Sequence, residues 1–110
     1  MVLLVLLFSY VFHFLSPTIS HALRLSRQLG DTSLQAQAYY SLGNTSSLVR
    51  DYPAAVAYHL RHLAMARRLG DRLGEARAHW SLANAYAGLG DLDRSLRCAR
   101  RYRQITIKEL

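Results

Sequence analysis

The chain repeats itself with a period of 40 residues, and this feature restricts its fold more than any other. Residues 31–70 align with residues 71–110 without a gap, and residues 23–30 align with residues 63–70, so the chain holds two units and the tail of a third. A repeat of this length is one supersecondary unit, whose apolar face is buried only when neighbours stack on it. The identical positions include Asp31 and Asp71, Ala38 and Ala78, Leu42 and Leu82, Asn44 and Asn84, and Arg61 and Arg101.

Each unit is predicted to form two helices. Apolar and small residues recur at helical spacing from Thr32 to about Val49, and Asp51 can then cap a second helix with Pro53 in its first turn. That helix should stop at Gly70. The second unit predicts helices over about 72–87 and 92–107, and no stretch alternates with period two. We therefore expect an all-α fold with an apolar N-terminal segment over 1–21, a repeat tail over 22–30, and repeats over 31–70 and 71–110.

Three runs carry a family resemblance, namely YSLGNT at 40–45, YHLRHL at 58–63 and WSLANAY at 80–86. Together with the long period, they resemble the later tetratricopeptide repeats of the Pins/LGN group of G-protein-signalling modulators over about residues 22–110. The resemblance implies an α-α superhelix whose inner groove binds extended segments of partners such as NuMA/Mud and Inscuteable. It also implies a cytoplasmic scaffold, at the cell cortex where such proteins act in spindle orientation and cell polarity.

Members of that group also carry C-terminal GoLoco motifs that bind Gα. This sequence contains no such motif, so we expect Gα binding only if motifs of this kind exist outside this chain, which would then be a fragment or a truncated relative. Two positions depart from the repeat pattern, because Ser46 stands opposite Tyr86 and Arg103 stands opposite Leu63.

A binding groove is predicted on the first helix of each unit. Asn side chains can bond a peptide backbone, an Arg can hold a carboxylate through two hydrogen bonds, and aromatic rings can anchor apolar side chains. We expect this stripe to bind an extended, acidic partner segment; the alternative is that the two aromatic residues pack between repeats. The stripe contains Gln37, Tyr40, Asn44 and Ser47 in the first unit and Arg77, Trp80 and Asn84 in the second.

The charge balance also favours an acidic partner. Fourteen Lys and Arg against seven Asp and Glu give a formal net charge of +7. In the last predicted helix, Arg94, Arg97 and Arg101 share one face, so an alternative function is RNA or anionic-lipid binding through residues 94–108. Tyr102 alone supplies aromatic surface there, and stacking on bases would need more, so we expect no nucleic acid as the partner.

No catalytic or metal chemistry is indicated. His59 and His62 have a spacing that metal ligands use, but a zinc site needs more ligands than these two. Cys98 is the only cysteine, which rules out an intrachain disulfide, and no base and orienting group accompany it in a recognisable pattern. We expect no enzyme activity, no cofactor and no metal site.

The N-terminal segment is almost wholly apolar from Met1 to Leu15. We expect a buried additional helix that ends near Ser16, because Pro17 follows. A secretory signal with a small-residue site at 20–22 is one alternative, although no basic residue precedes the apolar run. A membrane anchor is the other, but the run is shorter than the ~20 residues that span a bilayer, so no stable membrane span is expected.

Overall fold

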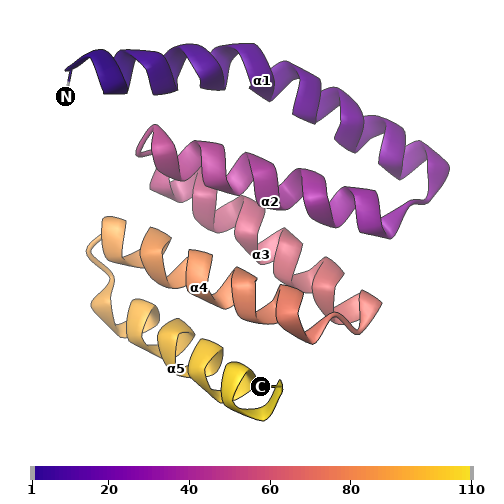
Figure 1. The fold of residues 1–110 in the computed structure, drawn as a ribbon, viewed down its shortest axis with the longest axis vertical. Helices are drawn as coiled ribbons and strands as arrows, with labels where there is room; N and C mark the ends of the chain where they lie inside the picture. The colour runs from indigo at the N-terminus through magenta and orange to yellow at the C-terminus, as the bar shows by residue number, and fades with distance from the viewer. Residues whose placement is uncertain (1, 110) are drawn as a thin grey trace.

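The computed structural model describes residues 2–109, and within them the side chains at positions 5, 8–16 and 109 lie outside the description. Helices follow one another as a single stack from α1 to α5, joined by short connections (Figure 1). No strand occurs in this described range, which confirms the all-α prediction. The helices are α1 (Val2–Leu29), α2 (Thr32–Leu48), α3 (Tyr52–Leu69), α4 (Arg72–Gly88) and α5 (Leu92–Glu109).

The ends of α3 follow the two residues predicted to cap it, Asp51 and Gly70. Asp51 caps α3 by accepting a hydrogen bond from the Ala54 backbone N–H at 3.3 Å, and Asp31 and Asp71 cap α2 and α4 in the same way. Gly70 closes α3 with φ of 67°, a left-handed conformation that glycine adopts without steric cost. The repeated Asp and Gly therefore fix where each hairpin begins and ends.

The N-terminal prediction was wrong in two respects. Helix α1 continues through Pro17 instead of ending near Ser16. Its apolar residues Val2, Leu3 and Leu6 are exposed instead of buried. Proline removes one backbone hydrogen bond, and a helix can continue on both sides of it where other contacts hold the two halves. Here Ile19 and Leu23, which follow the proline, pack against α2. Among the helices of residues 2–109, none combines the length and hydropathy needed to cross a lipid bilayer.

Two apolar clusters join successive helices. The first contains Leu23, Ala38, Tyr39 and Leu42, and it ties α1 to α2. The second ties α3 to α4 through Leu63, Ala78 and Leu82. Each cluster thus lies at a junction between one hairpin and the next, as expected for stacked repeats.

A close approach of α2 and α3 depends on Gly43. A Cβ at this position would lie 2.5 Å from the ring of His59, which is itself fully buried. In the second unit the equivalent pair is Ala83 and Ala99, and there Ser95 donates a hydrogen bond to the Ala83 carbonyl at 2.8 Å. Small side chains let both hairpins close, as the sequence indicates, but through different partners.

The stack is curved, with α2 and α4, the first helices of the two units, on the concave side. Helix α2 contacts α4, whereas over the described residues α3 makes no backbone contact with α1 or α5. The first helices of the two units therefore lie on the inner side of the curve, and α1, α3 and α5 lie on its outer side.

Candidate partner-binding groove

The inner face carries a small cavity where the two units meet. This cavity, of about 180 Å³, is enclosed by the start of α4, the end of α3 and the first half of α2. Three of the seven predicted groove residues line it, namely Gln37, Tyr40 and Arg77. The structure thus brings together predicted residues from two successive first helices, which sequence spacing alone places on separate units.

Arg77 is the cationic group of this cavity. Its guanidinium is exposed and, among the described residues, makes no hydrogen bond or ion pair. Its neighbours in the cavity are His62 and Asp71. Burial lowers the pKa of His62; the charge of Asp71 opposes this shift and that of Arg77 adds to it. His62 is therefore held as a neutral imidazole beside a free guanidinium.

The aromatic residues Tyr40 and Trp80 have equivalent contacts. The Tyr40 ring lies 5.0 Å from the His62 ring, and the Trp80 ring lies 5.1 Å from the ring of Tyr102, which occupies the matching position in the second unit. Each ring thus packs against the second helix of its own hairpin, and Tyr40 also lines the cavity between the two units. Trp80 still leaves 52% of its surface exposed, so it also offers apolar surface to a ligand.

The remaining predicted groove residues lie apart from the cavity. Asn44 and Ser47 are half-buried on α2, and Asn84 is exposed on α4. None of the three belongs to the lining of the cavity. They continue the same helical faces toward the C-terminal ends of α2 and α4, so the predicted stripe is longer than the cavity.

Comparison with known families decides what kind of chain this is. The family model described as "Tetratricopeptide repeat" matches residues 34–108, which is more than half of the chain. The chain belongs to the tetratricopeptide repeat (TPR) family. A search of curated proteins gave no match. TPR repeats are modules for protein–protein interaction, and the groove described above holds polar and aromatic groups on its lining.

The predicted basic face of the TPR array lies on α5. Arg94, Arg97 and Arg101 are all exposed. Arg94 is engaged by Asp91 at 3.4 Å and lies over the ring of Tyr86, with its Cζ 5.8 Å from the centroid. Arg101 donates a hydrogen bond to Gln104 at 3.3 Å. The carboxylate of Asp91 thus offsets the charge of Arg94, whereas the neutral amide of Gln104 leaves the charge of Arg101 in place.

The TPR units bury three histidines. His59, His62 and His79 have ring nitrogens without hydrogen-bond partners within the described residues. Burial lowers the pKa of His59 to about 4, and protonation of the neighbouring His62 would lower it further. No group of three potential metal ligands occurs in the described part of the TPR array. The rings of His59 and His62 contact the Tyr40 ring and pack between α2 and α3. His79 is buried on α4.

Cys98 is half-buried on the side of α5 that faces the apolar cluster between α3 and α4. Burial raises the pKa of its thiol above the ordinary value, although the nearby charge of Arg97 opposes the shift. A raised pKa keeps the sulfur as a thiol at neutral pH, where it is a poor nucleophile. Cys98 contacts the cluster around Leu82 and serves as packing material in the second TPR unit.

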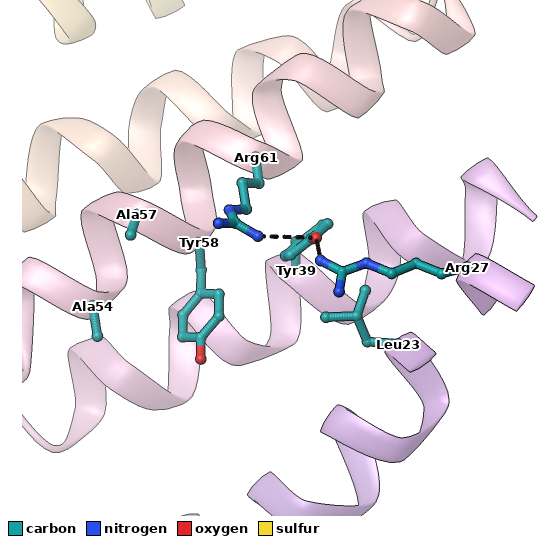
Figure 2. A pocket seen from close by; sticks show the side chains of 7 residues that line it. All are labelled: Leu23, Arg27, Tyr39, Ala54, Ala57, Tyr58 and Arg61. Carbon is teal, nitrogen blue, oxygen red and sulfur yellow. Dashed lines mark hydrogen bonds between the residues drawn. The ribbon is translucent and has the colours of Figure 1, made fainter. Parts of the chain in front are cut away.

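Sequence reasoning did not find a second cavity of the TPR array, which opens on its outer face. Figure 2 shows Arg27 and Arg61 approaching the hydroxyl of Tyr39 from opposite sides. The cavity has a volume of about 450 Å³ and is bounded by α1, α2 and α3. The alignment of the two units contains a signal for it, because Arg27, Tyr39 and Arg61 correspond to Arg67, His79 and Arg101.

Proposed function

We propose that the concave face of this TPR array binds an extended, acidic segment of a partner protein. The observation that carries the proposal is the inner cavity, in which Arg77 of one unit lies beside Gln37 and Tyr40 of the preceding unit. A partner carboxylate could pair with the unengaged guanidinium through two hydrogen bonds, while the exposed amide of Gln37 bonds the peptide backbone. A peptide that crosses this point would contact both units at once.

The resemblance to the Pins/LGN group suggests a more specific role. By that resemblance the partner would be a NuMA/Mud-like or Inscuteable-like acidic segment, and the protein would act in the cytoplasm and at the cell cortex as a G-protein-signalling modulator during spindle orientation. Gα would bind only through GoLoco motifs outside this chain.

The test is a titration of a labelled Glu-rich peptide against the full chain at low and physiological salt. Because Arg77→Glu removes the pairing group and adds repulsion, it should weaken binding by about 2–5 kcal/mol if the pair is desolvated, and by less at a rim. The control reverses Arg97 and Arg101 to Glu on the outer helix and should change binding little. A Gln37→Ala variant tests the backbone contact separately.

The opposite outcome would favour the second candidate function. If Arg77→Glu binds as the unmodified chain does and the Arg97 and Arg101 reversal abolishes binding, then the site is the basic outer helix over residues 94–108. Titration of single-stranded RNA and of vesicles containing phosphatidylserine would then distinguish its two ligand classes, because the salt dependence follows the number of phosphates neutralised.

A further inference from the structure

The outer cavity brings two positive charges to one buried phenol. Arg61 donates a hydrogen bond to the Tyr39 oxygen at 3.4 Å, and Arg27 donates a second bond to the same atom. Each guanidinium carbon lies 5.7 Å from the centre of the Tyr39 ring. Tyr39 forms the floor with only 4% of its surface exposed, and the two arginines rise from α1 and α3 on either side (Figure 2). Two like charges held this close repel each other unless an anion lies between them.

The second unit provides an internal comparison, because it supplies an anion of its own. There Arg67 and Arg101 lie around His79. Burial is the main cause that lowers the pKa of this imidazole, and the charges of the two arginines lower it further. The carboxylate of Glu75, with 6% of its surface exposed, lies 3.8 Å from Arg67. This buried acid offsets part of the charge of Arg67, and it also forms a shorter ion pair with Arg72 at 3.1 Å.

The first unit has no such acid. Gln35 occupies the position of Glu75, and its side-chain amide donates to the Ser26 carbonyl at 3.5 Å. Among the described residues that line the outer cavity, none is acidic. The charges of Arg27 and Arg61 are therefore left without a carboxylate where the second unit provides one.

The first unit also leaves room for a ligand. Ala54 and Ala57 line the outer cavity, and the second unit places Arg94 and Arg97 at the matching positions. Leu23 and the ring of Tyr58 complete an apolar wall beside the charged floor. A ligand that fits must therefore combine an anionic end with an apolar stem.

We propose that the cavity between α1 and α3 is a binding site for a phosphorylated side chain of a partner protein, held by Arg27, Arg61 and the hydroxyl of Tyr39. The Tyr39 oxygen accepts from both arginines, so its own hydrogen is available to donate. Two guanidinium groups and one hydroxyl thus present donors to the three oxygens of a phosphomonoester. A phosphomonoester also carries a charge of about −1.5 to −2 at neutral pH, which matches the two arginines better than one carboxylate or one phosphodiester does.

The experiment is a titration of the full chain with a short, otherwise neutral peptide that carries one phosphoserine or one phosphotyrosine. The same peptide with unmodified Ser and with Asp provides the comparison, and all titrations are made at physiological salt. We expect saturable binding of the phosphopeptide, and binding of the Asp peptide weaker by about tenfold or more because one charge and one acceptor oxygen are lost.

Four variants locate the site. Arg27→Gln and Arg61→Gln should each weaken phosphopeptide binding by about tenfold or more, since each removes a charge-assisted hydrogen bond. Tyr39→Phe keeps the buried ring and should cause a smaller loss. Gln35→Glu introduces the carboxylate that the second unit already has and should also reduce binding. Circular dichroism verifies that every variant retains its helices.

Two control variants keep the outcome specific. Arg68→Gln makes the same change of charge on an exposed part of α3 and should bind as the unmodified chain does. Arg77→Glu separates the two proposals, because the phosphate should stay bound at Arg27 and Arg61 when the groove is changed. Loss of phosphopeptide binding in Arg77→Glu, with binding retained in Arg27→Gln and Arg61→Gln, would assign the phosphate to the concave groove and overturn this proposal.

Several results would overturn the proposal. These are no saturable binding up to millimolar peptide, equal binding of the Asp peptide, unchanged binding in both Arg27→Gln and Arg61→Gln, or an equal loss in Arg68→Gln. Binding to vesicles containing phosphatidylserine that depends on Arg27 and Arg61, without binding of the phosphopeptide, would also overturn it and would assign the site to a lipid headgroup.

Discussion

His59 occupies the closest approach of α2 and α3, where Gly43 makes room for its ring. It is fully buried, and neither ring nitrogen has a hydrogen-bond partner among the described residues. A neutral imidazole tolerates this environment far better than a charged one. At the scale of single residues, this hairpin is therefore built around a group whose ionisation opposes folding.

The low pKa of His59, about 4, predicts acid sensitivity. The unfolded chain has an ordinary value near 6.5 and binds the proton more readily, so stability is full above about pH 6.5 and falls as the pH drops toward 4. The loss should approach about 3 kcal/mol. Urea unfolding monitored by circular dichroism between pH 7 and 4 measures it. His59→Gln should flatten this dependence and His21→Gln, at an exposed position, should not; equal slopes for all three proteins would contradict the assignment.

Gly43 and His59 should be energetically coupled. Gly43→Ala inserts a methyl group 2.5 Å from the ring and should destabilise the chain by about 1–3 kcal/mol through overpacking. The double variant Gly43→Ala with His59→Ala reproduces the pair Ala83 and Ala99 of the second unit. Its destabilisation should therefore be smaller than the sum of the two single changes, with a coupling of about 0.5–3 kcal/mol in a double-mutant cycle. Strict additivity would show that the methyl group does not meet the ring.

At the scale of helices, each helix from α2 to α5 begins after an aspartate whose carboxylate accepts a hydrogen bond from the first turn. Asp51 is exposed, and its carboxylate is bonded to the first turn of α3 at the Ala54 N–H. This makes it a cleaner test of capping than Asp71, which also lines the inner cavity.

Asp51→Ala should destabilise the chain by about 1 kcal/mol, because the backbone N–H groups of the first turn lose their acceptor. Asp51→Asn keeps a side-chain oxygen at the same place and should retain most of the stability. Thermal unfolding by circular dichroism compares the two. If Asn and Ala cost the same, the contribution comes from negative charge near the helix N-terminus and not from the cap.

The helices were also the level at which the sequence was most informative. Periodicity, Asp51 and Gly70 predicted the helices from Thr32 onward to within about two residues, because each signal acts within one or two turns. Pro17 misled, since its local preference for ending a helix was outweighed where Ile19 and Leu23 pack on α2.

The candidate site was less predictable than the helices. The spacing within each first helix predicted Gln37, Tyr40 and Arg77 as groove residues. The cavity that they share is also lined by His62 and Asp71, which come from other segments and which helical spacing does not connect to them. The outer cavity was missed because Arg27, Tyr39 and Arg61 come from three helices and share no face.

At the scale of the molecule, α5 presents an apolar face that the stack does not cover. Leu92 and Leu96 are 66% and 54% exposed, whereas Tyr52 and Val56, their counterparts on α3, are half-buried. Val56 packs on the cluster that joins α3 to α4. The exposed leucines thus occupy the position at which one repeat receives the next.

The 110-residue chain should therefore unfold in a broad transition of low midpoint, because two repeats bury little continuous core. Appending a second copy of residues 71–110 directly after Leu110 keeps the 40-residue register and should raise the midpoint by several degrees. In the control, the appended copy carries Lys in place of the leucine that corresponds to Leu82, and it should not stabilise. A sharp transition above about 90 °C for the unmodified chain would contradict this description.

The arrangement of the helices affects how the curvature of the stack can change. Helix α2 contacts α4 on the inner side, whereas α1 and α3 are separated on the outer side. The first helices form the pivot of the curve, so a change of curvature is taken up mainly as a change in the gaps between outer helices. Arg27 and Arg61 stand on opposite sides of one such gap. A ligand that joins them would hold the two outer helices at a fixed separation. Binding on the outer surface would then restrict changes in the curvature of the concave face, for which we propose peptide binding.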